Sequence, residues 1–233
     1  MKFINFTTSG VTSWGCLIVN KSDNQPVLDG TQSARFELRP GDCGVSLTYS
    51  DCENHRSRAE ISDQAAKAYT ATQGQIITFN TNIYIPTQPN LYTSQTLSLI
   101  LTQINYQYNL ASGELVSYGD LASLQMNKSG ALIIQTYSDF SWNPLNNYTV
   151  STNPMNQWIN IRYEIKSTTS GDGYFKAYVN GALLLNETRS TLPAALGSNY
   201  LRVGIYANLQ PGGKASDTQV VYFDGISKQV SNF

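Results

Sequence analysis

The alternation of apolar and polar residues with a period of two is the feature of this sequence that most constrains its fold. It is clearest at 158–166, where Ile159, Ile161 and Tyr163 occupy alternate positions. A period of two places alternate side chains on opposite faces of a β-strand, so this segment predicts a strand with one buried face. The same interpretation predicts strands at residues 3–6, 16–19, 33–39, 56–61, 75–85, 97–106, 117–127, 131–137, 158–166, 174–179, 182–185, 200–207 and 220–224.

Turn signals separate these strands. Pro40-Gly41-Asp42 ends the strand at 33–39, and Asn180-Gly181 is the strongest short signal for a β-hairpin. Residues 63–72 have room for one or two helical turns, but a loop is the better interpretation. Many evenly spaced strands with almost no helical periodicity predict an all-β protein, most simply a concanavalin-like jelly roll of two antiparallel sheets. No linker or shift in composition divides residues 1–233, so we expect a single domain.

Composition and charge exclude several classes of protein. The net charge is −1, from 15 basic and 16 acidic residues, and neither sign forms a long run. This pattern has no basic footprint for nucleic acid and no basic patch for a membrane surface. No apolar run approaches the roughly 18 residues of a transmembrane helix. We therefore expect neither nucleic acid nor membrane as a partner.

The sequence contains three cysteines, which cannot all pair with one another. Cys43 and Cys52 flank a segment of eight residues and could join the two arms of a hairpin. Three buried thiols are the alternative. The sequence leaves both open.

The segment from His55 to Ile61 gathers titratable groups in a chain that is only 13% charged. His55 is the single histidine, and a strand over this segment would put Arg56, Arg58 and Glu60 on one face. His55 lies three residues from Arg58, so it joins that face only from a loop or a β-bulge. We interpret this strand as one wall of an anion-binding cleft.

Three other clusters place polar side chains on one face of a predicted strand. They are Gln103 with Asn105; Tyr200 with Arg202 and Tyr206; and Tyr174 with Lys176 and Tyr178. Each cluster alone is typical of an ordinary solvent-exposed strand. Together they supply arginines, amides, tyrosines and few carboxylates, which predicts an anion-binding cleft on the concave face of the sandwich.

Four segments resemble motifs of the jelly-roll polysaccharide lyases, a group that includes alginate lyases, glucuronan lyases and heparin-lyase-like enzymes. Residues 58–61 are similar to their Arg-x-Glu-Leu motif, and residues 103–105 resemble the Gln-Ile-His motif of alginate lyases. Residues 200–206 resemble the Tyr-Phe-Lys-Ala-Gly-x-Tyr segment, and residues 171–181 resemble the heparin-lyase-like group. The resemblance covers residues 33–225. One departure is Asn105, which stands where alginate lyases have histidine, so the pattern is closer to glucuronan lyases.

The resemblance implies β-elimination of a uronic-acid polymer. Arg58, Gln103 and Asn105 would hydrogen-bond the uronate carboxylate, and Tyr206 would be the acid that protonates the leaving oxygen. His55 is then the candidate base, unless Tyr206 serves as both base and acid and His55 only binds or orients. The remaining candidates for substrate binding are Arg56, Glu60, Arg202, Tyr200, Lys176 and Tyr178.

The main alternative is a non-catalytic carbohydrate-binding sandwich, such as a lectin or a phage receptor-binding domain. A glycoside hydrolase is disfavoured because the glutamates form no close carboxylate pair. We expect a monomer that requires no cofactor and no catalytic metal, although related lyases can hold a structural Ca²⁺. The N-terminus lacks the apolar segment of a signal peptide. We therefore expect an extracellular protein whose leader has been removed, or one carried on a phage particle.

Overall fold

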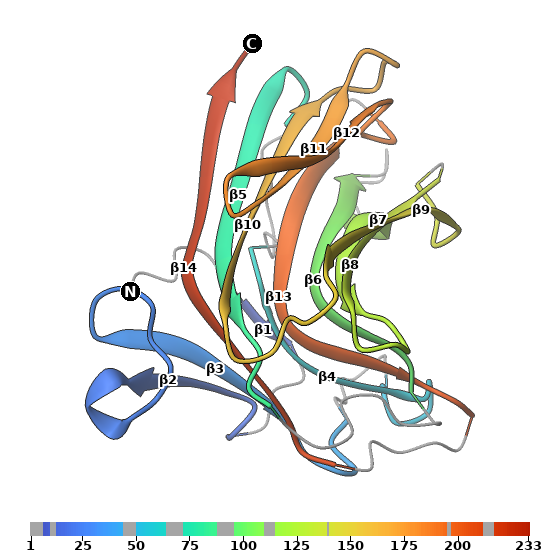
Figure 1. Ribbon diagram of the computed structural model, residues 1–233. Helices are drawn as coiled ribbons and strands as arrows, with labels where there is room; N and C mark the ends of the chain where they lie inside the picture. The colour runs from blue at the N-terminus through green and yellow to red at the C-terminus, as the bar shows by residue number, and fades with distance from the viewer. Residues whose placement is uncertain are drawn as a thin grey trace.

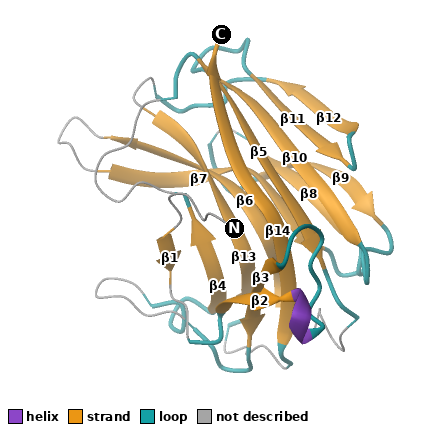
Figure 2. Cartoon of the chain, turned by 90° about the vertical axis from the view of Figure 1, so that its left-hand side faces the viewer, coloured by secondary structure: helices purple, strands orange, loops and turns teal. Residues whose placement is uncertain are grey.

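The computed structural model describes residues 7–9, 13–43, 50–63, 72–87, 96–109, 115–138, 140–194, 197–211 and 217–233. These residues form strands, loops and one three-residue 3-10 helix, η1 (Lys21–Asp23), which lies beside β2 in Figure 2. The strands are β1 (Thr7–Ser9), β2 (Cys16–Asn20), β3 (Gln32–Leu38), β4 (Arg56–Ser62), β5 (Gln75–Tyr84), β6 (Thr96–Asn109), β7 (Leu115–Met126), β8 (Leu132–Tyr137), β9 (Pro144–Ser151), β10 (Trp158–Ser167), β11 (Tyr174–Val179), β12 (Ala182–Thr188), β13 (Gly197–Leu209) and β14 (Gln219–Asn232).

The strands form two antiparallel sheets of seven strands each. The first sheet has the order β1-β4-β13-β6-β7-β8-β9, and the second has the order β12-β11-β10-β5-β14-β3-β2. In Figure 1, β14, β5 and β10 run side by side in one layer, and β13, β6 and β7 run in the other. The all-β sandwich predicted from the sequence is confirmed. Sheet neighbours such as β13 and β4 are far apart in the chain, as expected for a jelly roll.

The core lies between the two sheets and is built from the apolar face of each strand. Phe36, Phe79, Phe175 and Phe223 contribute fully buried rings from the second sheet, and Leu201 faces them from the first sheet. The alternation at 158–166 is realised as β10, with Ile159, Ile161, Tyr163 and Ile165 buried and the residues between them partly exposed. Burying this face supplies the main driving force for the sandwich.

Two edge strands are absent from the sequence-based prediction. β9 begins with Pro144 and carries mostly exposed, polar side chains, and β1 pairs only with β4. β1 has only three residues and β9 has no buried face, so neither strand carries the alternating apolar pattern that identifies the others. β14 also extends to Asn232, well beyond the predicted end at 224, because it pairs along the whole of β5. The predicted strand at 3–6 and most of the predicted loop at 63–72 lie outside the described residues.

Cys43 and Cys52 form a disulfide, with their Cα atoms 5.2 Å apart. The structure thus decides between the two alternatives that the sequence left open. The bridge closes a short loop immediately before β4, and loop-closure entropy predicts a stabilisation of roughly 2–3 kcal/mol for a loop of this size. Cys16 is half-buried in β2, and its burial raises the pKa of the thiol to about 11.

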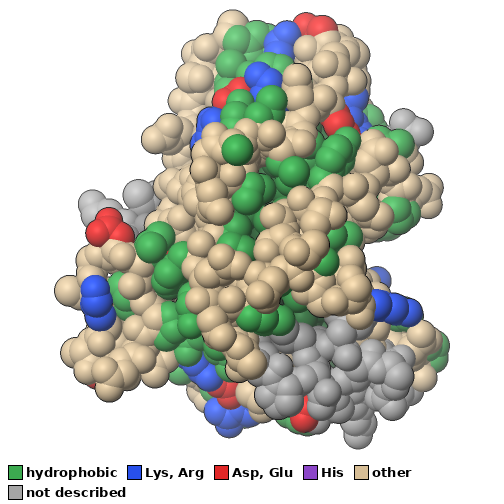
Figure 3. All heavy atoms as spheres, viewed as in Figure 1, with side chains coloured by type: hydrophobic (Ala, Val, Ile, Leu, Met, Phe, Trp, Pro, Cys, Tyr) green, Lys and Arg blue, Asp and Glu red, His purple; other side chains and the backbone are tan. Residues whose placement is uncertain are grey.

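On the face shown in Figure 3, Lys and Arg side chains lie beside Asp and Glu side chains at several places. Ion pairs among the described residues include Lys166 with Asp172 at 2.7 Å and Lys228 with Asp63 at 2.8 Å. Within the described residues, no helix has the length and apolar character needed to cross a membrane.

Candidate active site

A cavity of about 470 Å³ opens on the outer face of the first sheet. Its walls come from β4, β6, β7, β8, β9 and β13. It includes seven residues that the sequence singled out: Arg56, Arg58, Gln103, Asn105, Tyr200, Arg202 and Tyr206. The structure therefore brings together three of the four predicted polar clusters.

The register of the strands explains why these side chains meet. In the antiparallel pairs, Tyr206 lies opposite Arg58, and Gln103 lies opposite Arg202. The residues between them, such as Ala59 and Leu201, point the other way and fill the core. A polar face and an apolar face are thus produced by the same alternation.

Gly204 allows β13 to pack closely against β4 at the floor of the cavity. It lies opposite Glu60, has a φ of 143°, and a Cβ atom at this position would collide with the carbonyl oxygen of Ala59. Only glycine fits such a close approach without strain. The glycine of the 200–206 motif therefore serves the packing of the strands on either side of the site.

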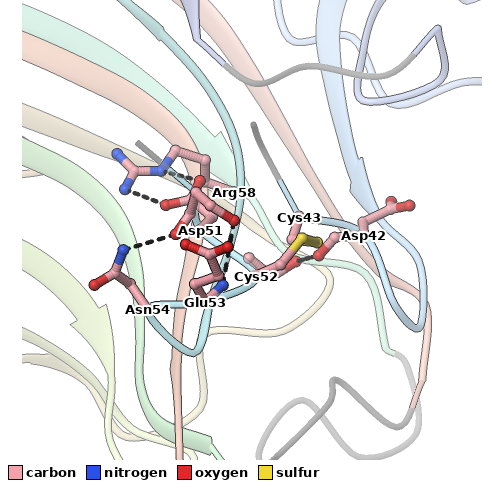
Figure 4. Close-up of a disulfide and its surroundings, with 9 residues drawn as sticks. Asp42, Cys43, Asp51, Cys52, Glu53, Asn54 and Arg58 are labelled. Atoms are coloured by element: carbon pink, nitrogen blue, oxygen red, sulfur yellow. Dashed lines mark hydrogen bonds and ion pairs between the residues drawn. A yellow bond between two sulfur atoms is a disulfide. The ribbon is translucent and has the colours of Figure 1, made fainter. Parts of the chain in front are cut away.

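Arg58 is held by Asp51, a residue that the sequence did not indicate. The Nε and Nη2 atoms of Arg58 donate to the two carboxylate oxygens of Asp51, each at 2.7 Å. Figure 4 shows the two side chains facing each other, with the Cys43–Cys52 disulfide adjacent to Asp51 in the chain. Burial alone would lower the pKa of Arg58, but the bonds to Asp51 and the charge of Glu60 raise it above its ordinary value. Arg58 is thus a cation held in a fixed orientation at the cavity wall.

Replacing Asp51 with asparagine is expected to disturb this arrangement. The variant breaks a buried, bidentate ion pair, so the free energy of unfolding should fall by roughly 3 kcal/mol. Activity should also fall, by about 10–100-fold in kcat/KM, because a small displacement of the Arg58 guanidinium changes its geometry towards the substrate. Urea unfolding and initial rates measure the two effects. The matched control is Asp172→Asn, which removes an exposed ion pair with Lys166. An Asp51→Asn enzyme with wild-type activity would show that this ion pair does not position Arg58.

Glu60 lies beneath the cavity and faces two of its arginines. Its side chain is 1% exposed, and its Oε2 atom is 3.8 Å from an Nη1 atom of both Arg58 and Arg202. Burial raises the pKa of Glu60, and the two arginines oppose that rise. Glu60 is not among the residues that line the cavity, so the structure does not bring it to the cavity wall together with the arginines.

Tyr206 has cations beside its ring and an amide at its hydroxyl. The guanidinium carbon of Arg58 lies 4.8 Å from the ring centre, and that of Arg56 lies 5.9 Å away. The hydroxyl donates to Oδ1 of Asn208 at 3.1 Å. Positive charge close to a phenol favours its ionised form, which is the form needed to accept a proton. Asn208 lines the cavity and was missed, because one asparagine in a polar loop-rich sequence gives no distinctive signal.

The opposite end of the cavity holds Asn105 and Asp120. These residues face each other across β6 and β7, and Nδ2 of Asn105 donates to Oδ1 of Asp120. Burial raises the pKa of Asp120 to about 7, although Arg202 and the bond from Asn105 act to lower it. Sequence reasoning missed Asp120. The available signal was that Asp120 is the single charged residue of a long, largely apolar strand.

The comparisons with known proteins agree with this geometry. The family model described as polysaccharide lyase matches residues 11–227, which is almost the whole chain. The chain belongs to the polysaccharide lyase family. It is therefore an enzyme of the lyase class that acts on a polysaccharide, and the non-catalytic binding module is no longer needed as an explanation.

Solved structures share the fold of the lyase at low sequence identity. The endo-β-1,4-glucuronan lyase of the fungus Trichoderma reesei is 16% identical, with 98% of this chain and 94% of that chain covered and a TM-score of 0.61. The alginate lyase AlgAT5 of polysaccharide lyase family 7 is 14% identical, with 97% and 94% covered and a TM-score of 0.60. The alginate lyase AlyC3 in complex with dimannuronate is 9% identical, with 87% and 76% covered and a TM-score of 0.61. A search among curated protein sequences gives no match.

His55 is not among the residues that line the cavity of the lyase. It sits in the turn before β4 with a φ of 55°, and its carbonyl oxygen accepts a hydrogen bond from the amide of Leu209 at 2.9 Å. Among the described residues, those that line the cavity begin at Arg56 and do not include His55. The structure therefore does not bring the predicted base to the cavity wall.

Lys176 and Tyr178 belong to the other sheet of the lyase. They lie on β11, where Phe175 and Ala177 point into the core, so Lys176 and Tyr178 face outward. Lys176 pairs with Glu164 at 3.4 Å, and the Arg162 guanidinium stacks 3.6 Å from the ring centre of Tyr178. The prediction that these two residues join the cleft is wrong. Strand alternation identifies a common face but does not tell which sheet carries it.

No group of three or more His, Cys, Asp or Glu side chains in the described part of the chain is arranged to hold a metal ion.

Trp142 lies at the rim of the cavity and was not among the residues predicted from the sequence. Its side chain lines the cavity and is 65% exposed. An exposed tryptophan at the mouth of a polar cavity is suited to stacking against a sugar ring.

Proposed function

We propose that the lyase cleaves a uronic-acid-containing polysaccharide by β-elimination, with a glucuronate or mannuronate unit at the site of cleavage. The observation that carries this proposal is the grouping of Arg58, Arg202 and Tyr206 around one cavity. Guanidinium groups match the carboxylate that distinguishes a uronic acid from a neutral sugar. The two solved structures named for a glucuronan lyase and for a dimannuronate complex share this fold, which supports the choice of substrate.

Neutralising the substrate carboxylate is the first requirement of the reaction. The C5 proton is only weakly acidic, because its removal puts more negative charge beside a carboxylate. Arg58 brings a guanidinium fixed by Asp51 to the cavity wall, and Gln103 brings an amide from β6. Such preorganised donors stabilise an enolate-like transition state in the same way as an oxyanion hole.

Tyr206 then transfers protons on one face of the sugar. Its phenolate takes the C5 proton, the electrons of the C5–H bond form the C4=C5 double bond, and the C4–O4 bond breaks. The phenol just formed gives its proton to the departing O4, which leaves as a hydroxyl and restores the phenolate. In glucuronate and mannuronate the C5 proton and O4 lie on the same side, so one tyrosine can do both steps. His55 outside the cavity wall is consistent with this assignment. The reaction as written uses no cofactor.

A panel of polymers tests the substrate proposal. The unsaturated uronate product absorbs in the ultraviolet, so initial rates can be followed directly on glucuronan, polymannuronate, polyguluronate and a neutral glucan. We expect turnover of glucuronan or polymannuronate, and none of the neutral glucan. Turnover of polyguluronate alone would contradict the single-tyrosine mechanism, because its C5 proton and O4 lie on opposite sides.

The large size of a polyuronate substrate and the presence of a disulfide both fit an extracellular site of action.

Trp142→Ala is expected to weaken substrate binding without changing the chemical step. Loss of one stacking surface should raise KM by about 5–20-fold, equivalent to ~1–2 kcal/mol, and leave kcat within twofold. Steady-state kinetics on the best polymer of the panel measures this. The control is Leu145→Ala, which removes an exposed apolar side chain three residues further along the chain. Trp158→Ala is not used as the control, because Trp158 packs against Tyr84. A large fall in kcat for Trp142→Ala would assign the residue to the chemistry instead.

A further inference from the structure

Asp120 is the one carboxylate that lines the cavity among the described residues, and the mechanism above does not use it. Asp120 is buried, with 4% of its surface exposed to solvent. Charged or titratable groups interact with it from the two neighbouring strands, Tyr106 on β6 and Tyr137 on β8, and from strands further across the same sheet, Arg202 on β13 and Glu60 on β4. A buried negative charge in a cavity for polyanions opposes binding of the substrate, so its protonation state matters.

The amide of Asn105 is oriented by Asp120. Nδ2 of Asn105 donates to Oδ1 of Asp120, and to Oε1 of Gln103 at 3.5 Å. Oδ1 of Asn105 is buried and accepts no hydrogen bond from any described residue. A carboxylate can only accept hydrogen bonds, so an ionised Asp120 forces the N–H side of the amide towards itself. The oxygen of Asn105 is then the amide atom that no described residue satisfies.

A uronate carboxylate is also an acceptor only, so it needs N–H donors from the cavity. When Asp120 is ionised, the Asn105 amide turns its N–H groups towards Asp120 and leaves its oxygen, which cannot donate a hydrogen bond to a carboxylate. A protonated Asp120 reverses this, because its O–H can donate to Oδ1 of Asn105 and release both Nδ2 hydrogens for the substrate. Protonation also removes the negative charge that repels the substrate.

We propose that Asp120 is a positioning residue that takes up one proton when the lyase binds a uronate, turning the Asn105 amide into a donor to the substrate carboxylate. The proton comes from solvent and returns to it when the product leaves. This inference rests on the proposed function, since it concerns recognition of the uronate carboxylate at the same site.

The electrostatics of the site support the proposal. Burial raises the pKa of Asp120 to about 7, with Glu60 adding to the rise and Arg202 opposing it. Burial also raises the pKa of Tyr137 to about 12 and that of Tyr106 further, so these two phenols remain neutral near pH 7. A bound anionic carboxylate disfavours the ionised form of Asp120 still more. Binding of the substrate therefore favours protonation of Asp120, and protonation of Asp120 favours binding of the substrate.

Calorimetric titration of a turnover-impaired enzyme tests this. Saturated tetramers of glucuronate and of mannuronate are titrated into the Tyr206→Phe variant between about pH 6 and 9, in buffers of different ionisation enthalpy. We expect uptake of about half a proton per tetramer at pH 7, approaching one proton above about pH 8 as free Asp120 becomes fully ionised. The dissociation constant should be constant below about pH 7 and rise by up to about tenfold per pH unit above it. Asp120→Asn in the same background should abolish both effects, because its amide is neutral at every pH and still donates to Asn105.

The possible outcomes separate this inference from the proposed function. If neither tetramer binds and no polyuronate is cleaved, the proposed function fails. If a tetramer binds without proton uptake and with an affinity that does not change with pH, only the role of Asp120 is overturned. Retention of the pH dependence in Asp120→Asn also overturns it. The proton count on the Asp120-containing enzyme needs no substitution at Asp120, so it decides the question even if Asp120→Asn does not fold.

Discussion

Replacing Tyr206 with phenylalanine is expected to lower kcat by about 10²–10⁴-fold while leaving oligosaccharide binding nearly intact. The substitution removes only the hydroxyl, which the proposed mechanism uses both to take the C5 proton and to protonate O4. The ring stays in place over the guanidinium groups of Arg58 and Arg56, so the cavity keeps its shape. Initial rates from the absorbance of the unsaturated product, together with calorimetric affinity, separate the two effects.

Two variants sharpen the assignment of the base. Tyr84→Phe is the matched control, because Tyr84 lies on β5 in the other sheet and should tolerate the same loss of a hydroxyl. His55→Ala should lower kcat by less than about tenfold, since its side chain is outside the cavity wall. If His55→Ala abolishes turnover and Tyr206→Phe does not, the roles assigned to these residues must be exchanged.

Arg58→Lys is expected to lower kcat by about 10²–10³-fold with little loss of folding stability. Lysine keeps the positive charge that compensates the buried Asp51 and Glu60. It cannot reproduce the planar fork that bonds both Asp51 oxygens and still offers N–H groups to a substrate carboxylate. The loss should fall on kcat, because the donors matter most when charge develops on the carboxylate.

Arg162→Lys provides the control for this variant. Arg162 lies on β10, stacks on Tyr178 and is remote from the cavity because it belongs to the outer face of the second sheet. It should leave kcat and KM unchanged, and thermal unfolding of both variants verifies that they fold. A rise in KM with an unchanged kcat for Arg58→Lys would mean that Arg58 binds ground state and transition state equally, which contradicts its proposed role.

The faces of the strands were predictable because they follow from a local rule. In β4 and β13 the polar set and the apolar set separate as the period of two requires. In β6 the alternation holds around Ile104, which is buried between Gln103 and Asn105, but it shifts at an irregularity after Ile100, so that Ser98 and Ile100 also line the cavity. The hairpin at Asn180-Gly181 was predictable for a similar reason, because both residues adopt positive φ values, 49° and 83°. β9 was not predictable, since an exposed edge strand leaves no pattern of burial.

The sequence by itself determined the all-β class, most of the strands, and which side chains share a face with Arg58, Gln103 and Tyr206. Tertiary structure decided the rest. It paired β4 with β13 and β13 with β6, which joined three polar faces into one cavity and left the Lys176 face on the opposite sheet. It also placed Asp51 against Arg58 and Asp120 against Asn105. Alternation is a property of neighbouring residues, so it can be recognised in the sequence. Pairing between distant strands depends on the packing of the whole core, so no local sequence pattern predicts it.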